Sequence, residues 1–151
     1  MLYTIGEMSR LLNIPASTLR YYDQEGLLPS VERSKGGIRM FSDQDYGWLK
    51  VIECLKKSGL SIREMKAYTD LAGKGDGSLT QRLELFRSRK DAVKEQIEDM
   101  KEILRLLEFK CWYYEQAIQN GTEDSVRSLT PDEVPEQFRL IKKEIDHTWY
   151  I

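Results

Sequence analysis

The sequence has little of what disulfide scaffolds and metal centres require. Its 151 residues include two cysteines, Cys54 and Cys111, and one histidine, His147. The cysteines form no CxxC pair, so we expect reduced thiols, although a single disulfide stays an open alternative. Soft metal ions are bound by closely placed thiolates, and neither cysteine has a second one nearby in the chain. These absences predict that the chain binds no metal ion and no cofactor.

Long apolar runs and the common catalytic motifs are also missing. No run approaches the ~20 apolar residues that span a bilayer, and the N-terminus lacks the charged start and apolar core of a signal peptide. We therefore expect a cytoplasmic protein that does not enter a membrane. No HExxH, GxSxG or P-loop motif is present, and one histidine leaves no set of nucleophile, base and orienting residue. The sequence predicts a protein that is not an enzyme.

Two short helices with a tight connection are predicted near the N-terminus. Thr4 and Glu7 fit a capping box that opens an amphipathic helix over residues 5–12. Residues 13–15 break this helix and lead into a second one, for which Gly26 is a suitable C-terminal cap. Such a pair of helices is typical of a helix-turn-helix.

A hairpin and two further helices should complete this region. Residues 33–41 place Gly36-Gly37 between short β-prone flanks, and so small a hairpin must pack on the helices as a wing. Helices are predicted over residues 42–58 and 61–71, each after a serine cap. The glycines at positions 73, 75 and 77 indicate a flexible joint.

The most regular pattern is an apolar repeat over about forty residues, with spacings that alternate between four and three. Lys90 is its only strongly polar position. A 3.5-residue repeat indicates a coiled coil, and its charged other faces require a partner helix, most simply that of a second copy. The pattern itself does not distinguish parallel from antiparallel pairing. The repeat positions, called the seam below, are Leu79, Leu83, Phe86, Lys90, Val93, Ile97, Met100, Leu104, Leu107, Cys111, Tyr114 and Ile118.

The end of the chain is predicted to be a short helical tail. Asn120-Gly121 ends the long helix, residues 122–130 form a loop, and a final helix runs from Thr130 to about Ile145. The expected fold is therefore dominated by α-helices. The predicted parts are a winged helix-turn-helix DNA-binding domain (1–72), a joint with a coiled-coil dimerisation helix (73–119), and a short effector or docking tail (120–151).

The second helix carries the groups that DNA reading needs, which are donors for base edges on a probe that fits the major groove. Tyr21 and Tyr22 point about 100° apart, so one should face DNA while the other packs inward. Ser17 and Thr18, taken singly, suit a helix N-terminus equally well. The predicted DNA contacts are Ser17, Thr18, Arg20, Tyr21 and Tyr22 in the helix, and Arg33, Lys35 and Arg39 in the wing.

Several segments closely resemble the MerR family of bacterial regulators, and the match covers residues 1–71 almost continuously. The segments are Thr4-Ile-Gly-Glu-Met-Ser, Thr18-Leu-Arg-Tyr-Tyr-Asp, Gly26-Leu-Leu-Pro, Arg33 with Gly37-Ile-Arg-Met-Phe, and Gly59-Leu-Ser-Ile-Arg-Glu.

The resemblance implies a winged-helix domain and an antiparallel coiled-coil homodimer. It also implies binding to a pseudo-palindromic promoter element, with DNA distortion that lets RNA polymerase engage both promoter hexamers. Carried over residue by residue, it places DNA contacts on the same helix positions, on Arg33 and Arg39 in the wing, and more weakly on Lys66 as a phosphate contact.

Cys54 is the first candidate for sensing a signal. Residues 51–61 resemble a thiol-dependent, aldehyde-responsive branch of the family, and Lys50, Lys56 or Lys57 could favour the thiolate. The alternative is that Cys54 is a small core residue, as free cysteines often are.

The C-terminal aromatic residues are the second candidate for sensing, through a pocket for a small apolar ligand. They could instead only dock the tail, and Cys111 could be structural because it lies in the seam. The residues concerned are Cys111, Trp112, Tyr113 and Tyr114, with Phe138, Trp149 and Tyr150.

For the chain as a whole, a helix-turn-helix coiled-coil adaptor that binds protein is the alternative function. The Arg20-Tyr-Tyr helix and the basic wing argue against it.

Overall fold

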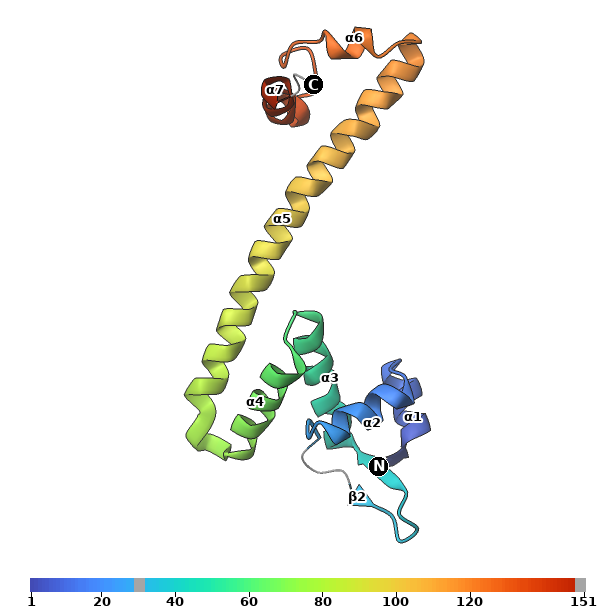
Figure 1. The fold of residues 1–151 in the computed structure, drawn as a ribbon, viewed down its shortest axis with the longest axis vertical. Helices are drawn as coiled ribbons and strands as arrows, with labels where there is room; N and C mark the ends of the chain where they lie inside the picture. Colours follow the sequence, from blue (N-terminus) through green and yellow to red (C-terminus); the bar gives the residue numbers. More distant parts are fainter. Residues whose placement is uncertain (29–31, 149–151) are drawn as a thin grey trace. The chain divides into compact units, whose positions relative to one another are not determined.

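The computed structural model describes residues 1–28 and 32–148, with backbone alone for residues 32, 33 and 146–148. It divides into two compact units, Met1–Val93 and Lys94–Ile151. Helices dominate both units, as predicted (Figure 1). The predicted boundaries at residues 72 and 119 follow motifs rather than packing, and the three-part division stays a prediction.

The N-terminal unit contains the predicted helix-turn-helix and hairpin. The capping box that opens α1 is formed, because the Thr4 N–H donates to Glu7 Oε2 over 2.8 Å and the Glu7 N–H donates back to Thr4 Oγ1. In chain order the elements are β1 (Leu2–Thr4), α1 (Ile5–Leu12), α2 (Ala16–Gln24), β2 (Glu32–Arg33), β3 (Arg39–Ser42), α3 (Asp43–Lys57), α4 (Ile62–Gly73) and the 3₁₀ turn η1 (Gly75–Ser78).

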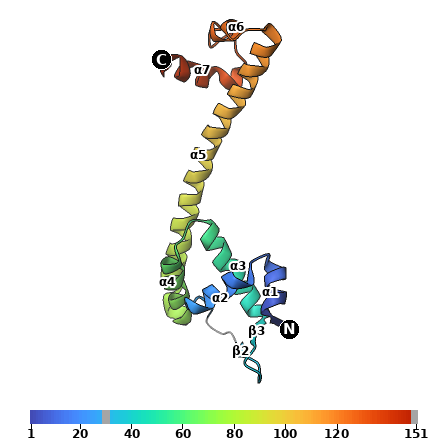
Figure 2. The same cartoon turned by 45° about the vertical axis from the view of Figure 1, so that its right-hand side comes forward.

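The hairpin belongs to a three-stranded antiparallel sheet of order β1-β3-β2. Tyr3 on β1 pairs with Phe41 on β3, and Arg33 on β2 pairs with Arg39. The sequence did not predict β1, since three residues that end in the helix cap Thr4 carry no strand pattern of their own. The turn of β2 and β3 projects from the helices of its unit (Figure 2).

The glycine-rich stretch after α4 contains the 3₁₀ turn η1, and the flexibility predicted for this joint stays a prediction. The Ser78 hydroxyl is buried and donates to the carbonyls of Leu71 and Gly75, over 2.5 and 2.9 Å. These bonds close η1 and lead directly into α5 (Leu79–Asn120), a single helix of 42 residues.

One apolar core holds the sheet and the four short helices of the first unit together. Met8, Leu19, Phe41, Leu49 and Ile52 have no exposed surface, and they come from α1, α2, β3 and α3. Burial of each such side chain stabilises the fold by about 1.5–3 kcal/mol. The wing and the second helix are therefore fixed on the same core.

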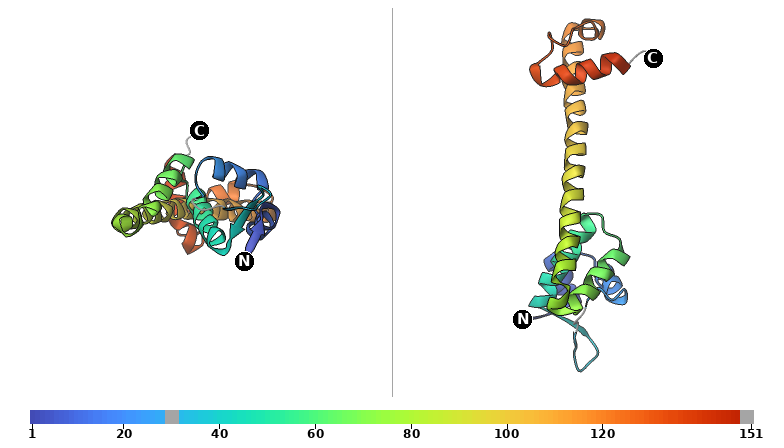
Figure 3. Two further views of the ribbon diagram at one scale, coloured as in Figure 1. Left: turned by 90° about the horizontal axis from the view of Figure 1, so that it is seen from below. Right: turned by 90° about the vertical axis from the view of Figure 1, so that its left-hand side faces the viewer.

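In the second unit, the tail that follows α5 packs on a face of this helix different from the seam. Phe109, Tyr113 and Ala117 are buried there against Val126, Val134 and Phe138 of the tail. Tail elements are α6 (Asp124–Arg127), the 3₁₀ turn η2 (Glu136–Phe138) and α7 (Arg139–Thr148), which crosses α5 (Figure 3). The periodicity of the seam does not reveal this second apolar row beside it.

Two predictions for the tail are wrong in detail. The predicted loop over residues 122–130 contains the single turn α6. The final helix begins at Arg139 and not at Thr130, although the Thr130 N–H donates to Glu133 Oε2 over 2.7 Å as in a cap. Pro135 has an extended backbone, and this interrupts the helix that the cap would have opened.

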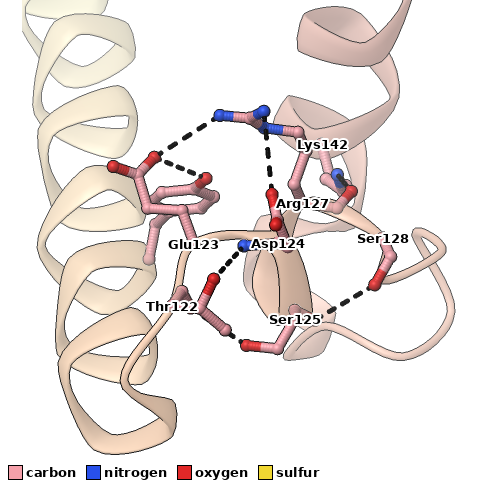
Figure 4. Close-up of polar contacts among 8 residues, drawn as sticks. Thr122, Glu123, Asp124, Ser125, Arg127, Ser128 and Lys142 are labelled. Carbon is pink, nitrogen blue, oxygen red and sulfur yellow. Dashed lines mark hydrogen bonds and ion pairs between the residues drawn. The ribbon is translucent and has the colours of Figure 1, made fainter.

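Polar contacts hold the tail together around α6. Figure 4 shows Arg127 between the carboxylates of Glu123 and Asp124, at 3.7 and 4.0 Å. The Tyr113 hydroxyl donates to Glu123 Oε2 over 3.0 Å, and the buried Lys142 ammonium donates to the Arg127 carbonyl over 3.1 Å. The C-terminus of α6 is thus satisfied by a lysine, as helix C-termini favour.

Within the described residues no helix is both long and apolar enough to cross a membrane. Over the same ranges, no cluster of three or more histidine, cysteine, aspartate or glutamate side chains could hold a metal ion.

Candidate nucleic-acid interface

One face of α2 is turned to solvent and carries three of the predicted contact residues. Ser17, Arg20 and Tyr21 are exposed, and Thr18 beside them is half-buried. The opposite face carries Leu19, which is fully buried in the core. Positions spaced by three and four share a helix face, so these side chains form one polar, donor-rich surface.

The predicted DNA contact by Tyr22 is wrong, because this side chain packs inward and is only 1% exposed. Its hydroxyl donates to Glu53 Oε1 on α3 over 2.5 Å, and the Lys56 ammonium lies 5.4 Å from the ring centre. Burial raises the pKa of the Tyr22 phenol, and the bond to Glu53 raises it further. Tyr22 therefore positions α2 on α3, while Tyr21 is the tyrosine that faces outward.

The wing is joined to α2 by an ion pair. The guanidinium of Arg39 on β3 contacts the carboxylate of Asp23 on α2, and both side chains are about four-fifths buried. Lys35 is exposed at the turn, which the Ser34 N–H closes by donating to the Ile38 carbonyl over 2.8 Å. The side chain of Arg33 lies outside the described residues.

The C-terminal end of α2 lies against α4. Gly26 has a φ of +72°, and a Cβ there would be 3.0 Å from Cε of Lys66. The Lys66 ammonium pairs with Asp70 one turn further along α4. Lys66 thus lies beside the C-terminal end of α2. Its contact with a DNA phosphate stays a prediction.

The sequence did not identify the residues that fix α2 and its exposed face in position. Asp23, Trp48 and Glu53 act through partners 16 to 31 residues away, and no local pattern marks such pairs. Only the Tyr21-Tyr22 pair carried a usable signal, because its helical angle required one ring to turn inward.

Cys54 is exposed on α3, so the alternative that it is a buried core residue is wrong. It lines an open hollow together with Lys50, Glu53 and Lys57 and with residues 11–14 at the end of α1. The third predicted neighbour, Lys56, lies instead over the ring of Tyr22.

Among the described residues, the C-terminal candidates for sensing do not form one site. Trp112 is half-buried and packs against Phe109 and Phe138, with ring centres 6.0 and 5.7 Å away, so it docks the tail. Cys111 and Tyr114 are exposed on the outer side of α5. Trp149 and Tyr150 lie outside the described residues.

The seam is almost entirely uncovered in a single chain. Leu83, Met100, Leu104 and Leu107 each expose between 50% and 63% of their surface, and Ile118 exposes 80%. So long an apolar stripe is uncommon on a monomer and marks an interaction surface.

Comparison with known proteins identifies the family. Residues 3–71 match the MerR HTH family regulatory proteins, and residues 47–108 match the MerR DNA-binding family. An uncharacterised HTH-type transcriptional regulator of Haemophilus influenzae is 39% identical over 136 residues, covering 90% of this chain and 98% of that protein. The chain belongs to the MerR family.

Two further relatives support this membership. The crystal structure of HiNmlR, a MerR family regulator lacking the sensor domain and bound to promoter DNA, is 39% identical, with a TM-score of 0.76. It covers 83% of this chain and 99% of its own. The HTH-type transcriptional regulator AdhR of Bacillus subtilis is 33% identical over 59% of this chain and 64% of its own. The chain is thus a transcriptional regulator and not an enzyme, and the adaptor alternative is not favoured.

Proposed function

We propose that this MerR regulator binds a pseudo-palindromic promoter site as a homodimer and distorts the DNA to control transcription by RNA polymerase. The outward face of α2 carries the proposal, because its donors are exposed while its other face is fixed in the core. A recognition helix contacts the bases through exposed residues at its start and middle. A cytoplasmic location is part of this proposal, since promoter DNA is there.

Each exposed group suits a particular contact. Arg20 can donate two parallel bonds to a guanine edge, while Ser17 and Thr18 lie near the helix N-terminus, where phosphates are favoured. Lys35 at the wing tip suits a backbone phosphate. Arg33 and Lys66 are proposed as further phosphate contacts, and Tyr21 as a contact to the sugar-phosphate backbone. Arg39, also predicted as a phosphate contact, would have to leave its ion pair with Asp23 to make one.

The seam supports the dimer. Two copies that bury the seam would present two α2 helices to two half-sites, and a twofold protein matches an inverted repeat. Bending a short duplex costs on the order of 1–6 kcal/mol, which phosphate contacts from both copies would offset.

We further propose that the dimer responds to an electrophile through Cys54. Its exposure supports this proposal, because an electrophile can reach the thiol through the open hollow that the side chain lines.

Salt titration of DNA binding tests the main proposal. A duplex selected from a pool of randomised inverted half-sites is titrated by fluorescence anisotropy, with a shuffled duplex beside it. Affinity for the selected duplex should fall about a thousandfold or more between about 50 and 200 mM salt, because phosphate contacts release counterions.

Arg20→Ala should weaken binding to the selected duplex by about 1–3 kcal/mol, because a bidentate base contact is lost. Arg105→Ala is the control, since Arg105 is exposed on α5 in the second unit. A chain that selects no duplex, or whose affinity is insensitive to salt, contradicts the proposal.

A further inference from the structure

Three aromatic side chains form a continuous stack through the N-terminal unit, which we call the aromatic column. Trp48 on α3 lies parallel to Tyr68 on α4, with ring centres 5.3 Å apart and planes 9° apart. Tyr68 meets the edge of Phe86 on α5 at 5.4 Å and 88°. Offset-parallel and edge-to-face contacts are the favoured geometries for aromatic pairs. The column therefore joins three helices through well-defined ring contacts.

One end of the column is tied to the end of the second helix. The Trp48 indole N–H donates to the Leu27 carbonyl over 2.7 Å, and the Leu27 N–H donates to the Tyr22 carbonyl inside α2 over 2.9 Å. Leu27 itself is fully buried. Through Leu27, the C-terminal end of α2 is thus linked to Trp48 by two hydrogen bonds.

The other end of the column lies in the seam. Phe86 is a seam position and keeps 37% of its surface exposed, so one side of its ring contacts Tyr68 while the other is open to a partner helix. Arg82 and Arg89 hold the same stretch of α5 on the unit. Arg82 donates to the Gly75 carbonyl over 3.0 Å, and Arg89 donates to the Ser58 carbonyl at the end of α3.

We propose that the aromatic column sets which half-site spacing the regulator accepts. Trp48, Tyr68 and Phe86 act as positioning residues, because they fix the direction of α2 relative to the start of α5. This inference rests on the proposed function, in which two copies joined through α5 read two half-sites.

Spacing is the property that such a connection controls. The half-sites of a dimeric helix-turn-helix protein repeat with the turn of the DNA, and each added base pair moves one half-site by 3.4 Å and also rotates it about the duplex. A rigid connection between α2 and α5 penalises the wrong spacing, whereas a loose one lets each α2 helix adjust. The column predicts a narrow spacing preference that does not depend on any residue that contacts DNA.

Tyr68 offers a matched pair of variants. Tyr68→Leu removes the central ring and interrupts the column, while Tyr68→Phe keeps both ring contacts and serves as the control. Tyr68 is not a seam position, so both variants should remain dimers by sedimentation equilibrium. The selected duplex is then remade with spacers changed in steps of one base pair, and affinity is measured for each.

We expect wild type and Tyr68→Phe to share one sharp optimum. For Tyr68→Leu, the ratio of affinity at the optimum to affinity one base pair away should fall about fivefold or more, which is the usual scale of coupling between sites. Binding to the shuffled duplex should stay unchanged, since the DNA-contacting side chains are intact.

Trp48→Phe is the second variant, and it decides the question if Tyr68→Leu does not fold. It keeps a ring in the column but removes the donor to Leu27, and it should also flatten the spacing profile. A folded dimeric variant whose profile matches wild type overturns the inference while leaving the proposed function intact. Failure of the wild type to bind any duplex is a different result, because it removes the proposed function itself.

Discussion

Cys54 follows Glu53 on α3, and Glu53 accepts the hydroxyl that anchors the second helix. Because Glu53 lines the same hollow as Cys54, a group added to the Cys54 sulfur would lie near the contact that positions Tyr22. The hollow beside the thiol is open, so a small reagent can reach it without unfolding the unit. Modification of Cys54 could therefore disturb the bond between Glu53 and Tyr22, and through it the position of α2.

Cys54→Ser should abolish the change in DNA binding that electrophiles cause, while the untreated protein binds as wild type does. The reason is that serine cannot supply the thiolate that attacks the electrophile. The measurement is anisotropy with the selected duplex, before and after treatment with a panel of aldehydes and a maleimide. Cys111→Ser is the control and should respond as wild type. A Cys54→Ser protein that still responds fully would refute sensing at this position.

Local signals along the chain predicted the helices whose starts are self-contained. The boxes at Thr4, Ser42 and Ser61 each use a partner three residues away, and all three form. Thr130 carries the same signal but opens no helix, because Pro135 follows within the first turns. Partners that are distant in sequence, such as Trp48 and Tyr68, produce no short-range sequence pattern, so only the structure identifies them.

The seam was predicted from periodicity alone, and its exposure in one chain fits that prediction. Leu104→Glu should convert the dimer to a monomer, because a charge would be buried in both copies of the interface. A loss of about 3 kcal/mol raises the dimer dissociation constant roughly a hundredfold. Sedimentation equilibrium measures the change.

Leu106→Glu is the matched control for this experiment. Leu106 is on the same helix and is 43% exposed, compared with 54% for Leu104, but it lies outside the seam and beside α7. It should leave the dimer intact. Equal dissociation constants for the wild type and Leu104→Glu would exclude the seam as the interface.

The stability of the whole chain should fall in acid, because several carboxylates are held by hydrogen bonds that only the folded state makes. The pKa of Glu7, Glu64 and Glu133 is lowered by backbone N–H groups at Thr4, Ser61 and Thr130, and by the hydroxyls of the same residues. A lowered folded pKa contributes stability above the unfolded value of about 4.3, and this is lost as pH falls through the folded pKa.

We therefore expect Tm to fall as pH is lowered from about 5 to about 3. Glu64→Gln should lower Tm at neutral pH and flatten this dependence, since its side chain no longer titrates. Differential scanning calorimetry across this range provides the test, with Glu108→Gln on the exposed surface of α5 as the control. A Tm that is constant between these limits would show that the capping carboxylates contribute nothing.

The uncovered seam also has a consequence for gene dosage. If only the dimer binds both half-sites, occupancy of the operator rises with the square of the chain concentration wherever the monomer predominates. Doubling synthesis would then raise weak occupancy about fourfold, and a modest drop would release the promoter disproportionately. The apolar stripe on α5 would thereby make the promoter respond to the amount of regulator as well as to its signal.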